Sequence, residues 1–190
     1  MRSLALALAL ATSGVACSPS STSGATDAGG DGNVPFAPDE CKASLAAGAT
    51  ANVTVGSGQS AYLDVAEGAT LTWERGPQGG HHVWVALRMI GLRKVGTLTS
   101  IDLDDLDVPD PHAADGGATN INHSRVIFDF EREEGGHCVL YGMRMQLDNA
   151  GSLALDQLVG AHLRITATLQ DPDGAKATSA RDVIVTGPLD

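Results

Sequence analysis

The sequence predicts an all-β fold for residues 40–190, a single antiparallel β-sandwich of about seven to nine strands. Three observations predict it: apolar and polar residues alternate with a period of two, turn residues separate the alternating segments, and helical patterns are scarce. Because roughly 150 residues are a normal size for one domain with one core, we expect a single folded domain.

Four segments carry the alternation. The residues expected on one face are Val83, Val85, Leu87 and Met89 in residues 82–90; Val126, Phe128 and Phe130 in residues 125–132; Val139, Tyr141, Met143, Met145 and Leu147 in residues 138–147; and Leu163, Ile165, Ala167 and Leu169 in residues 162–170. Turn signals such as GPQGG, EEGGH and DPDG separate them. Residues 152–160 (SLALDQLVG) are compatible with one short helix or with the start of the next strand, and both stay open.

The last part of the chain carries a resemblance. Residues 158–187 contain an alternating strand, an Asp-Pro-Asp-Gly turn beginning at Asp171, and a valine-rich final segment around Ile184. This resembles the closing hairpin of bacterial immunoglobulin-like or polycystic-kidney-disease-like repeats. The resemblance implies an immunoglobulin-like sandwich of no characterised function.

The N-terminus has the pattern of a signal peptide. Arg2 precedes the apolar residues 4–11, and small residues follow up to Cys17. The sequence GVAC resembles the lipobox of bacterial lipoproteins, although Gly14 stands where that family usually has Leu. The resemblance implies cleavage of residues 1–16, lipidation of Cys17 and, because Ser18 is not aspartate, sorting to the outer membrane. The alternative is an ordinary signal peptide and a secreted protein.

Residues 17–39 are expected to be the lipidated Cys17 and a flexible tether. The segment is rich in Ser, Gly and Asp and has little to bury, so it cannot offset its ordering entropy. The net charge is −11, and −12 once residues 1–16 are removed. This acidic balance argues against nucleic acid as a partner. The expected partners are the membrane, through the lipid anchor only, and a protein at the cell envelope.

Two cysteines remain besides Cys17. Cys41 and Cys138 are expected to form a disulfide, because an exported chain meets an oxidising compartment. Two independent buried thiols are the alternative.

The segment RGPQGGHHVW, residues 75–84, contains a candidate contact surface. Its glycines and proline predict a turn before a strand, and no helix follows that would make a phosphate-binding loop. His82, Trp84 and Arg88 share one face of the strand, with Gln78 nearby. If that face is exposed, these residues suit contact with a partner; if Trp84 packs inward, the segment is structural.

Metal binding is the alternative function. The candidate ligands for zinc, copper or calcium are His81, His82, His137, Asp102, Asp104 and Asp107. The alternative without a metal is that the histidines lie in exposed loops, with one packed in the core. The acidic residues 102–115 would then form a solvated edge strand and loop. No EF-hand or blue-copper spacing is present, and no cofactor is predicted.

Catalytic motifs are absent: the sequence contains no Gly-x-Ser-x-Gly elbow, and a disulfide would leave no nucleophilic cysteine. We therefore predict a lipid-anchored, exported binding or structural module at the cell surface or periplasmic face. A metal-binding surface lipoprotein is the first alternative, and a surface hydrolase is the last.

Overall fold

The structure, a computed structural model, describes residues 40–76, 80–113, 117–148 and 159–187, which belong to the compact unit Phe36–Asp190. These residues form eleven strands, a short helix α1 (Glu40–Ala43) and a 3-10 turn, η1 (Glu134–Gly136). Three of the strands are only two residues long, which leaves eight longer ones. The predicted all-β sandwich is confirmed.

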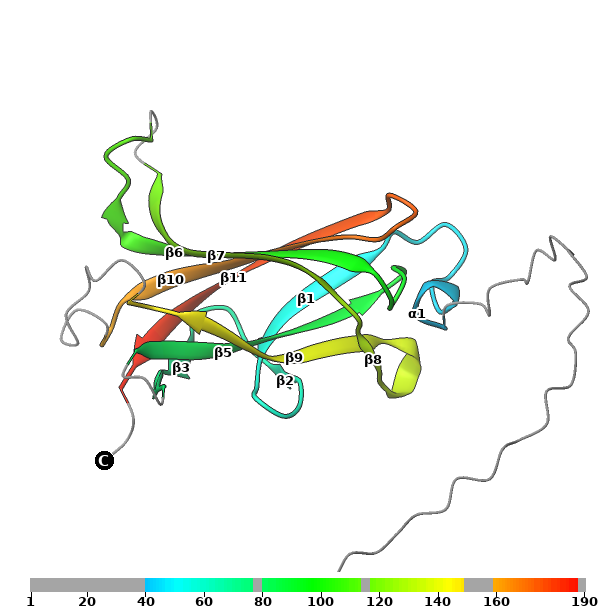
Figure 1. Cartoon of the computed structure of the whole chain (residues 1–190), viewed down its shortest axis with the longest axis horizontal. Helices are drawn as coiled ribbons and strands as arrows, with labels where there is room; N and C mark the ends of the chain where they lie inside the picture. The colour runs from blue at the N-terminus through cyan, green and yellow to red at the C-terminus, as the bar shows by residue number, and fades with distance from the viewer. Residues whose placement is uncertain (1–39, 77–79, 114–116, 149–158, 188–190) are drawn as a thin grey trace, which may run out of the picture. The chain divides into compact units, whose positions relative to one another are not determined.

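Two sheets face each other (Figure 1). Sheet A has the order β2 (Leu63–Asp64), β1 (Asn52–Ser57), β5 (His81–Ile90), β9 (Cys138–Gln146) and β8 (Glu131–Arg132), and β4 (Glu74–Arg75) also pairs with β5. Sheet B has the order β3 (Ala69–Thr72), β11 (Lys176–Thr186), β10 (His162–Gln170), β6 (Thr97–Pro109) and β7 (Ala118–Phe128). One pair departs from the predicted antiparallel arrangement, because β3 runs parallel to β11.

The core lies between the sheets and is built largely from alternate residues of strands such as β5, β6 and β10. Val83, Val85, Leu87 and Met89 of β5 are buried, as are Leu163, Ile165, Ala167 and Leu169 of β10. The sequence pattern predicted these two faces, and both are confirmed. Each fully buried Val or Leu contributes roughly 1.5–3 kcal/mol to the free energy of unfolding.

Strand β9 departs from the predicted alternation. Val85 of β5 pairs with Met143, but Leu87 pairs with Leu140, so β9 has an extra residue opposite β5 at this point. Gly142 lies in this bulge with φ +73°. The bulge moves the side chains before it out of step with those after it. Met143, Met145 and Leu147 therefore belong to the main core, as expected, whereas Val139 packs with Tyr141 in a separate cluster.

The acidic segment is also placed differently from the expectation. Asp102, Asp104 and Asp107 belong to β6, which has β10 on one side and β7 on the other. The segment therefore begins within the sheet, and the expected edge position is wrong. The order of strands in a sheet depends on pairing between distant segments, and the charge of one segment does not predict it.

Several expectations fall outside the described residues. These are the signal peptide 1–16, lipidated Cys17, the tether up to residue 39, Gln78, and residues 149–158 of the ambiguous segment. Within the described ranges, none of the helices has the length and apolar character needed to cross a membrane.

Candidate functional site

Strand β5 begins with two histidines that pack against the two tryptophans of the chain. The ring of His81 meets Trp73 edge to face, with 4.6 Å between the centroids. The ring of His82 meets Trp84 in the same way at 4.8 Å. Successive side chains of a strand point to opposite faces. The two pairs therefore lie on opposite faces of β5, and the side chains of His81 and His82 point away from each other.

His82 and Trp84 are less exposed than residues of an open contact surface would be. His82 is only 4 % exposed, and Trp84 is partly buried. Neither His82 Nε2 nor Trp84 Nε1 has a hydrogen-bond partner in the structure. Burial, followed by the nearby Arg144 charge, holds the pKa of His82 below its usual value. His82 is therefore neutral at pH 7.

A break in sheet A lies beside Trp84. On one side of β5, β1 pairs with residues 86–90 and β4 pairs with residues 81 and 82. Between these two registers, no strand of the described residues pairs with Val83, Trp84 and Val85 on this side, although β9 covers the other side. The chain opens this break because, after β2, it crosses to sheet B as β3 and returns to sheet A only at β4.

The break contains a cavity of about 430 Å³. Its lining comes from the end of β1 and the loop after it, from β2, from β3, and from Glu74 and Trp84. Ser57, at the end of β1, donates its hydroxyl to the carbonyl of Trp84 at 2.9 Å, which fixes one wall of the cavity. This volume lies within the usual range of small-molecule sites, roughly 300–1,000 Å³.

Charges on the cavity wall are negative. Asp64 and Glu74 both line it, and the lining contains no Lys, Arg or His. The guanidinium of Arg88 lies 3.6 Å from Asp64. Arg88 is engaged more closely by Glu133, with two hydrogen bonds of 2.7 and 2.9 Å.

Beyond Asp64, the outer face of sheet A is covered by Tyr62. The ring of Tyr62 packs with Ala86 and Val139, and Arg88 Cζ lies 4.0 Å from its centroid. Burial, reinforced by Asp64, raises the pKa of Tyr62 to about 12. The loop that carries Tyr62 is fixed to the bulge, because Gly142 donates its backbone N–H to the Gly58 carbonyl at 2.9 Å.

The members of the predicted contact surface are thus not one open strip. His82 is buried, Trp84 borders the cavity, and Arg88 lies under Tyr62 and Glu133. Gln78 lies outside the described residues. His82 and Arg88 therefore have structural contacts. The part of the predicted contact surface that a ligand can still reach is Trp84, in the wall of the cavity.

The candidate metal ligands are separated from one another. Three histidines each face one aspartate through Nδ1: His81 with Asp148 at 3.2 Å, His123 with Asp102 at 2.6 Å, and His162 with Asp107 at 2.9 Å. Asp104 accepts from Asn120 at 2.8 Å. The backbone N–H of His162 holds the pKa of Asp107 below its usual value. Across the part of the chain that is described, no three His, Cys, Asp or Glu side chains gather as a metal site would require.

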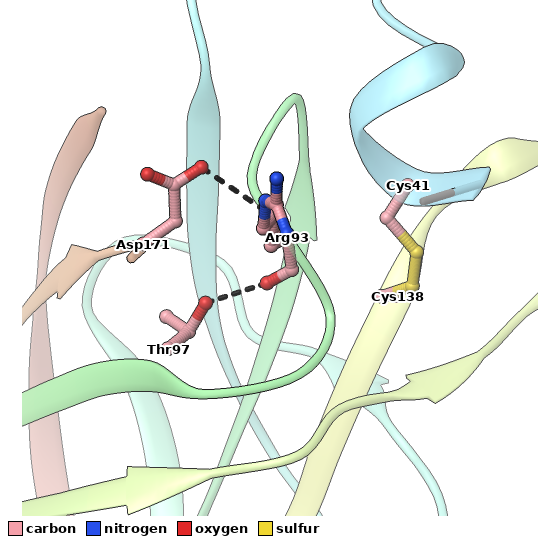
Figure 2. The surroundings of a disulfide bond; sticks show 5 residues. All are labelled: Cys41, Arg93, Thr97, Cys138 and Asp171. Carbon is pink, nitrogen blue, oxygen red and sulfur yellow. Dashed lines mark hydrogen bonds between the residues drawn. A yellow bond between two sulfur atoms is a disulfide. The ribbon is translucent and has the colours of Figure 1, made fainter. Parts of the chain in front are cut away.

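The predicted disulfide joins the first helix to sheet A (Figure 2). Cys41 of α1 is bonded to Cys138 of β9, with 5.9 Å between the Cα atoms and a sequence separation of 97. The carbonyl of Cys41 also accepts a hydrogen bond from the backbone N–H of Gly91 at 2.8 Å.

The predicted Asp-Pro-Asp-Gly turn connects β10 and β11. Within it, the side chain of Asp171 accepts a hydrogen bond from the backbone N–H of Ala175 at 2.9 Å.

Sequence reasoning missed the residues around the cavity. Glu74 directly precedes the segment 75–84 in the sequence. It lies opposite His82 because the chain returns to sheet A as β4. Arg144 of β9 is the cross-strand neighbour of Trp84 of β5. The sequence pattern did not indicate this pairing, because the bulge in β9 shifts the register of the two strands. The sequence signal for the bulge was a glycine inside the alternating segment, Gly142 in YGM.

Comparison with known proteins adds no family. No family model and no curated protein sequence matches the chain. Similar solved structures include CopC from Methylosinus trichosporium OB3b, with 12 % identity, a TM-score of 0.31, and coverage of 66 % of this chain and 89 % of that one. Murine CRIg has 13 % identity, a TM-score of 0.32, and coverage of 73 % and 99 %. The CooA pilin subunit from enterotoxigenic Escherichia coli has 9 % identity, a TM-score of 0.32, and coverage of 73 % and 99 %. No ligand or activity is carried from these proteins to this chain.

Proposed function

We propose that this protein is an exported, lipid-anchored binding module that takes a small ligand in the cavity beside Trp84. In this proposal, residues 1–16 are removed, Cys17 carries the lipid, and residues 18–39 tether the sandwich to the outer membrane. The single observation that carries the binding function is the break in sheet A, because it leaves an open cavity of about 430 Å³ where an uninterrupted sheet would leave none.

The anchor is supported by the sequence of the N-terminus alone. Several buried acyl chains hold a protein on a membrane firmly, since each buried methylene contributes about 0.8 kcal/mol. A tether of ~20 residues has a typical reach of roughly 25 Å, which places the domain beyond the lipid headgroups. A protein partner at the cell envelope is compatible with this position.

The anchor is tested by expressing the full chain in a Gram-negative host. We expect the mature protein to begin at a lipidated Cys17, as measured by mass spectrometry, and to fractionate with the outer membrane. Cys17→Ser should release it from the membrane fraction, and Ser18→Asp should keep it membrane-bound but redirect it to the inner membrane. An unmodified mature N-terminus, or a Cys17→Ser protein that still sediments with membranes, would contradict the anchor.

The binding function is tested with five probes: D-glucose, D-glucosamine, choline, acetate and inorganic phosphate. Proton saturation-transfer NMR on the purified mature chain for the four organic probes, and ³¹P line broadening for phosphate, should give a binding signal for at least one of them. Thr70→Trp should abolish that signal, because Thr70 is an exposed residue of β3 on the cavity wall and a large ring there fills the space. No signal from any probe would refute the small-ligand function and favour a purely structural module.

Metal binding stays a prediction of the sequence. It is checked by the melting temperature with calcium, zinc or copper, each with and without chelator. A chelator-sensitive rise would establish it, and no shift at millimolar calcium or micromolar zinc and copper would exclude it. The hydrolase alternative has no observation in its favour among the described residues.

A further inference from the structure

We propose that the ligand of this cavity is a small organic cation, a primary or quaternary ammonium compound, held between Trp84 and the carboxylates of Glu74 and Asp64. This inference rests on the proposed binding function and names the ligand class.

The first argument is the charge of the wall. Glu74 lies on β4, the exposed strand that borders the break, and it has no ion-pair partner among the described residues. Asp64 lies across the cavity on β2, its side chain 77 % exposed, with Arg88 as its only ion-pair partner in the described part of the chain. Arg88 is already neutralised by two closer hydrogen bonds to Glu133. An anion would meet two carboxylates there, whereas a cation would be attracted by both.

The second argument is the aromatic side chain. Trp84 lines the cavity, and the indole is the aromatic group that binds cations most strongly through its π-face. His82, which packs edge-on against Trp84, is neutral at pH 7 and adds no competing charge. Carboxylates beside an indole are a combination that suits ammonium groups.

The third argument is the size and polarity of the remaining wall. Ser57, Gln59 and Thr72 offer hydroxyl and amide groups, while Leu63 and Val65 offer apolar surface. Leu63 is 60 % exposed, so a bound ligand would cover apolar area that water now meets. A compound that carries an ammonium group together with a few methyl, methylene or hydroxyl groups would contact both kinds of surface.

One positive group lies close enough to oppose binding. Arg144 is exposed and is the cross-strand neighbour of Trp84 on β9. Although β4 and β9 flank β5 on opposite sides, the guanidinium of Arg144 reaches toward β4: its Nη1 lies 3.8 Å from the position that a Cβ on Gly76 would occupy. Removing the charge of Arg144 should therefore strengthen the binding of a cation, whereas removing that of Glu74 should weaken it.

The test uses the indole N–H signals of the ¹⁵N-labelled mature chain. The protein has two tryptophans, so its spectrum contains two indole signals, and Trp84→Phe identifies which one belongs to Trp84. Choline and D-glucosamine are titrated at low ionic strength, with D-glucose as the neutral match of glucosamine. We expect the Trp84 signal to shift with both cations, the Trp73 signal to stay in place, and glucose to bind at least fivefold more weakly than glucosamine.

The variants separate charge from shape. Glu74→Gln keeps the size of the side chain and should weaken the binding of both cations about fivefold, the upper range for one partly exposed charge pair. Arg144→Gln should tighten it, and Glu131→Gln, on the distant β8, should leave it unchanged. The affinity for the cations should also fall as salt is raised.

Three outcomes overturn the inference. If glucose shifts the Trp84 signal as strongly as glucosamine does, the cavity recognises neutral sugars, and the binding function survives without the charge. If only acetate or phosphate binds, the sign of the charge is wrong. If Glu74→Gln folds normally and binds both cations as tightly as the unchanged protein, the carboxylate has no role.

Discussion

The side-chain ammonium of Lys42 lies 3.1 Å from the carboxylate of Asp171, although 129 residues separate them in the sequence. Lys42 belongs to α1, and Asp171 begins the turn between β10 and β11. The contact therefore joins the first helix to sheet B, while the neighbouring Cys41 joins it to sheet A through Cys138. A helix of only four residues is fixed to both layers by side chains next to each other in the chain.

Asp171 and Asp173 should differ sharply when each is replaced by asparagine. The side chain of Asp171 is fully buried and accepts hydrogen bonds from Lys42 and from the backbone N–H of Ala175. Asp171→Asn weakens these charge-assisted bonds and should lower the free energy of unfolding by about 1–3 kcal/mol. Asp173→Asn should have a smaller effect, because Asp173 is exposed and its ion pairs with Lys42 and Arg93 are screened by water. Urea denaturation of both variants measures the difference, and equal losses would contradict the burial argument.

Removing the disulfide should lower stability substantially. Its loop spans 97 residues, and the chain-entropy model gives a loss of about 4–5 kcal/mol for a loop of this length, as an upper value. Cys41→Ala combined with Cys138→Ala should show this loss in guanidinium denaturation. The unchanged protein should lose a similar amount when a reductant is added, whereas the double variant should be insensitive to it. A free-thiol assay that finds both thiols in unreduced, denatured protein would disprove the bond.

Gly142→Ala should destabilise the domain more than Gly174→Ala. Both glycines have a positive φ, which costs an alanine roughly 1–2 kcal/mol. A Cβ on Gly174 would meet nothing within 4 Å, but one on Gly142 would lie 2.8 Å from the backbone oxygen of Gln59. The Gly142 variant must therefore also displace the loop after β1, which is a wall of the cavity. Thermal denaturation compares the two, and the prediction is wrong if Gly174→Ala is the more damaging.

The stability of the protein should fall as the pH drops through about 6.5, partly because of His82. Burial holds the pKa of His82 below its usual value in the folded state. In the unfolded chain the imidazole takes up its proton near pH 6.5. Below that pH the unfolded state binds a proton that the folded state does not, so the free energy of unfolding decreases.

Urea denaturation at pH 7.5 and pH 5.5 measures this effect. His82→Gln should reduce the difference in stability between the two pH values. His112→Gln, at an exposed loop position, serves as the control and should leave the difference unchanged. An identical pH dependence in the His82 variant and the unchanged protein would show that His82 does not contribute.

The faces of β5 and β10 were predictable because both strands are regular, and period-two alternation then translates directly into burial. The face of β9 was predictable only after Gly142, since one extra residue there reverses the alternation of the residues before it without changing the composition. The disulfide followed from counting cysteines together with the expected compartment.

The cavity could not be predicted from the segment around Trp84 alone. It depends on where β1 ends, on the crossing of β3 to the other sheet, and on the return of β4. These are relations between distant parts of the chain. For the same reason, the sequence indicated His82 and Trp84 as neighbours but did not show that His82 is buried.

The bond between Cys41 and Cys138 also determines how the domain would carry mechanical load. In the proposed arrangement, a tether ending at residue 39 would lead into α1 just before Cys41, and tension from the membrane anchor would reach β9 through a covalent bond. Hydrogen bonds of α1 alone would yield at far lower force than that bond. Trp84 and Glu74 lie inside the loop that it closes, between residues 41 and 138. Force between a bound ligand and the anchor would then act within the loop that the disulfide closes, and it would not unfold the domain from its N-terminus.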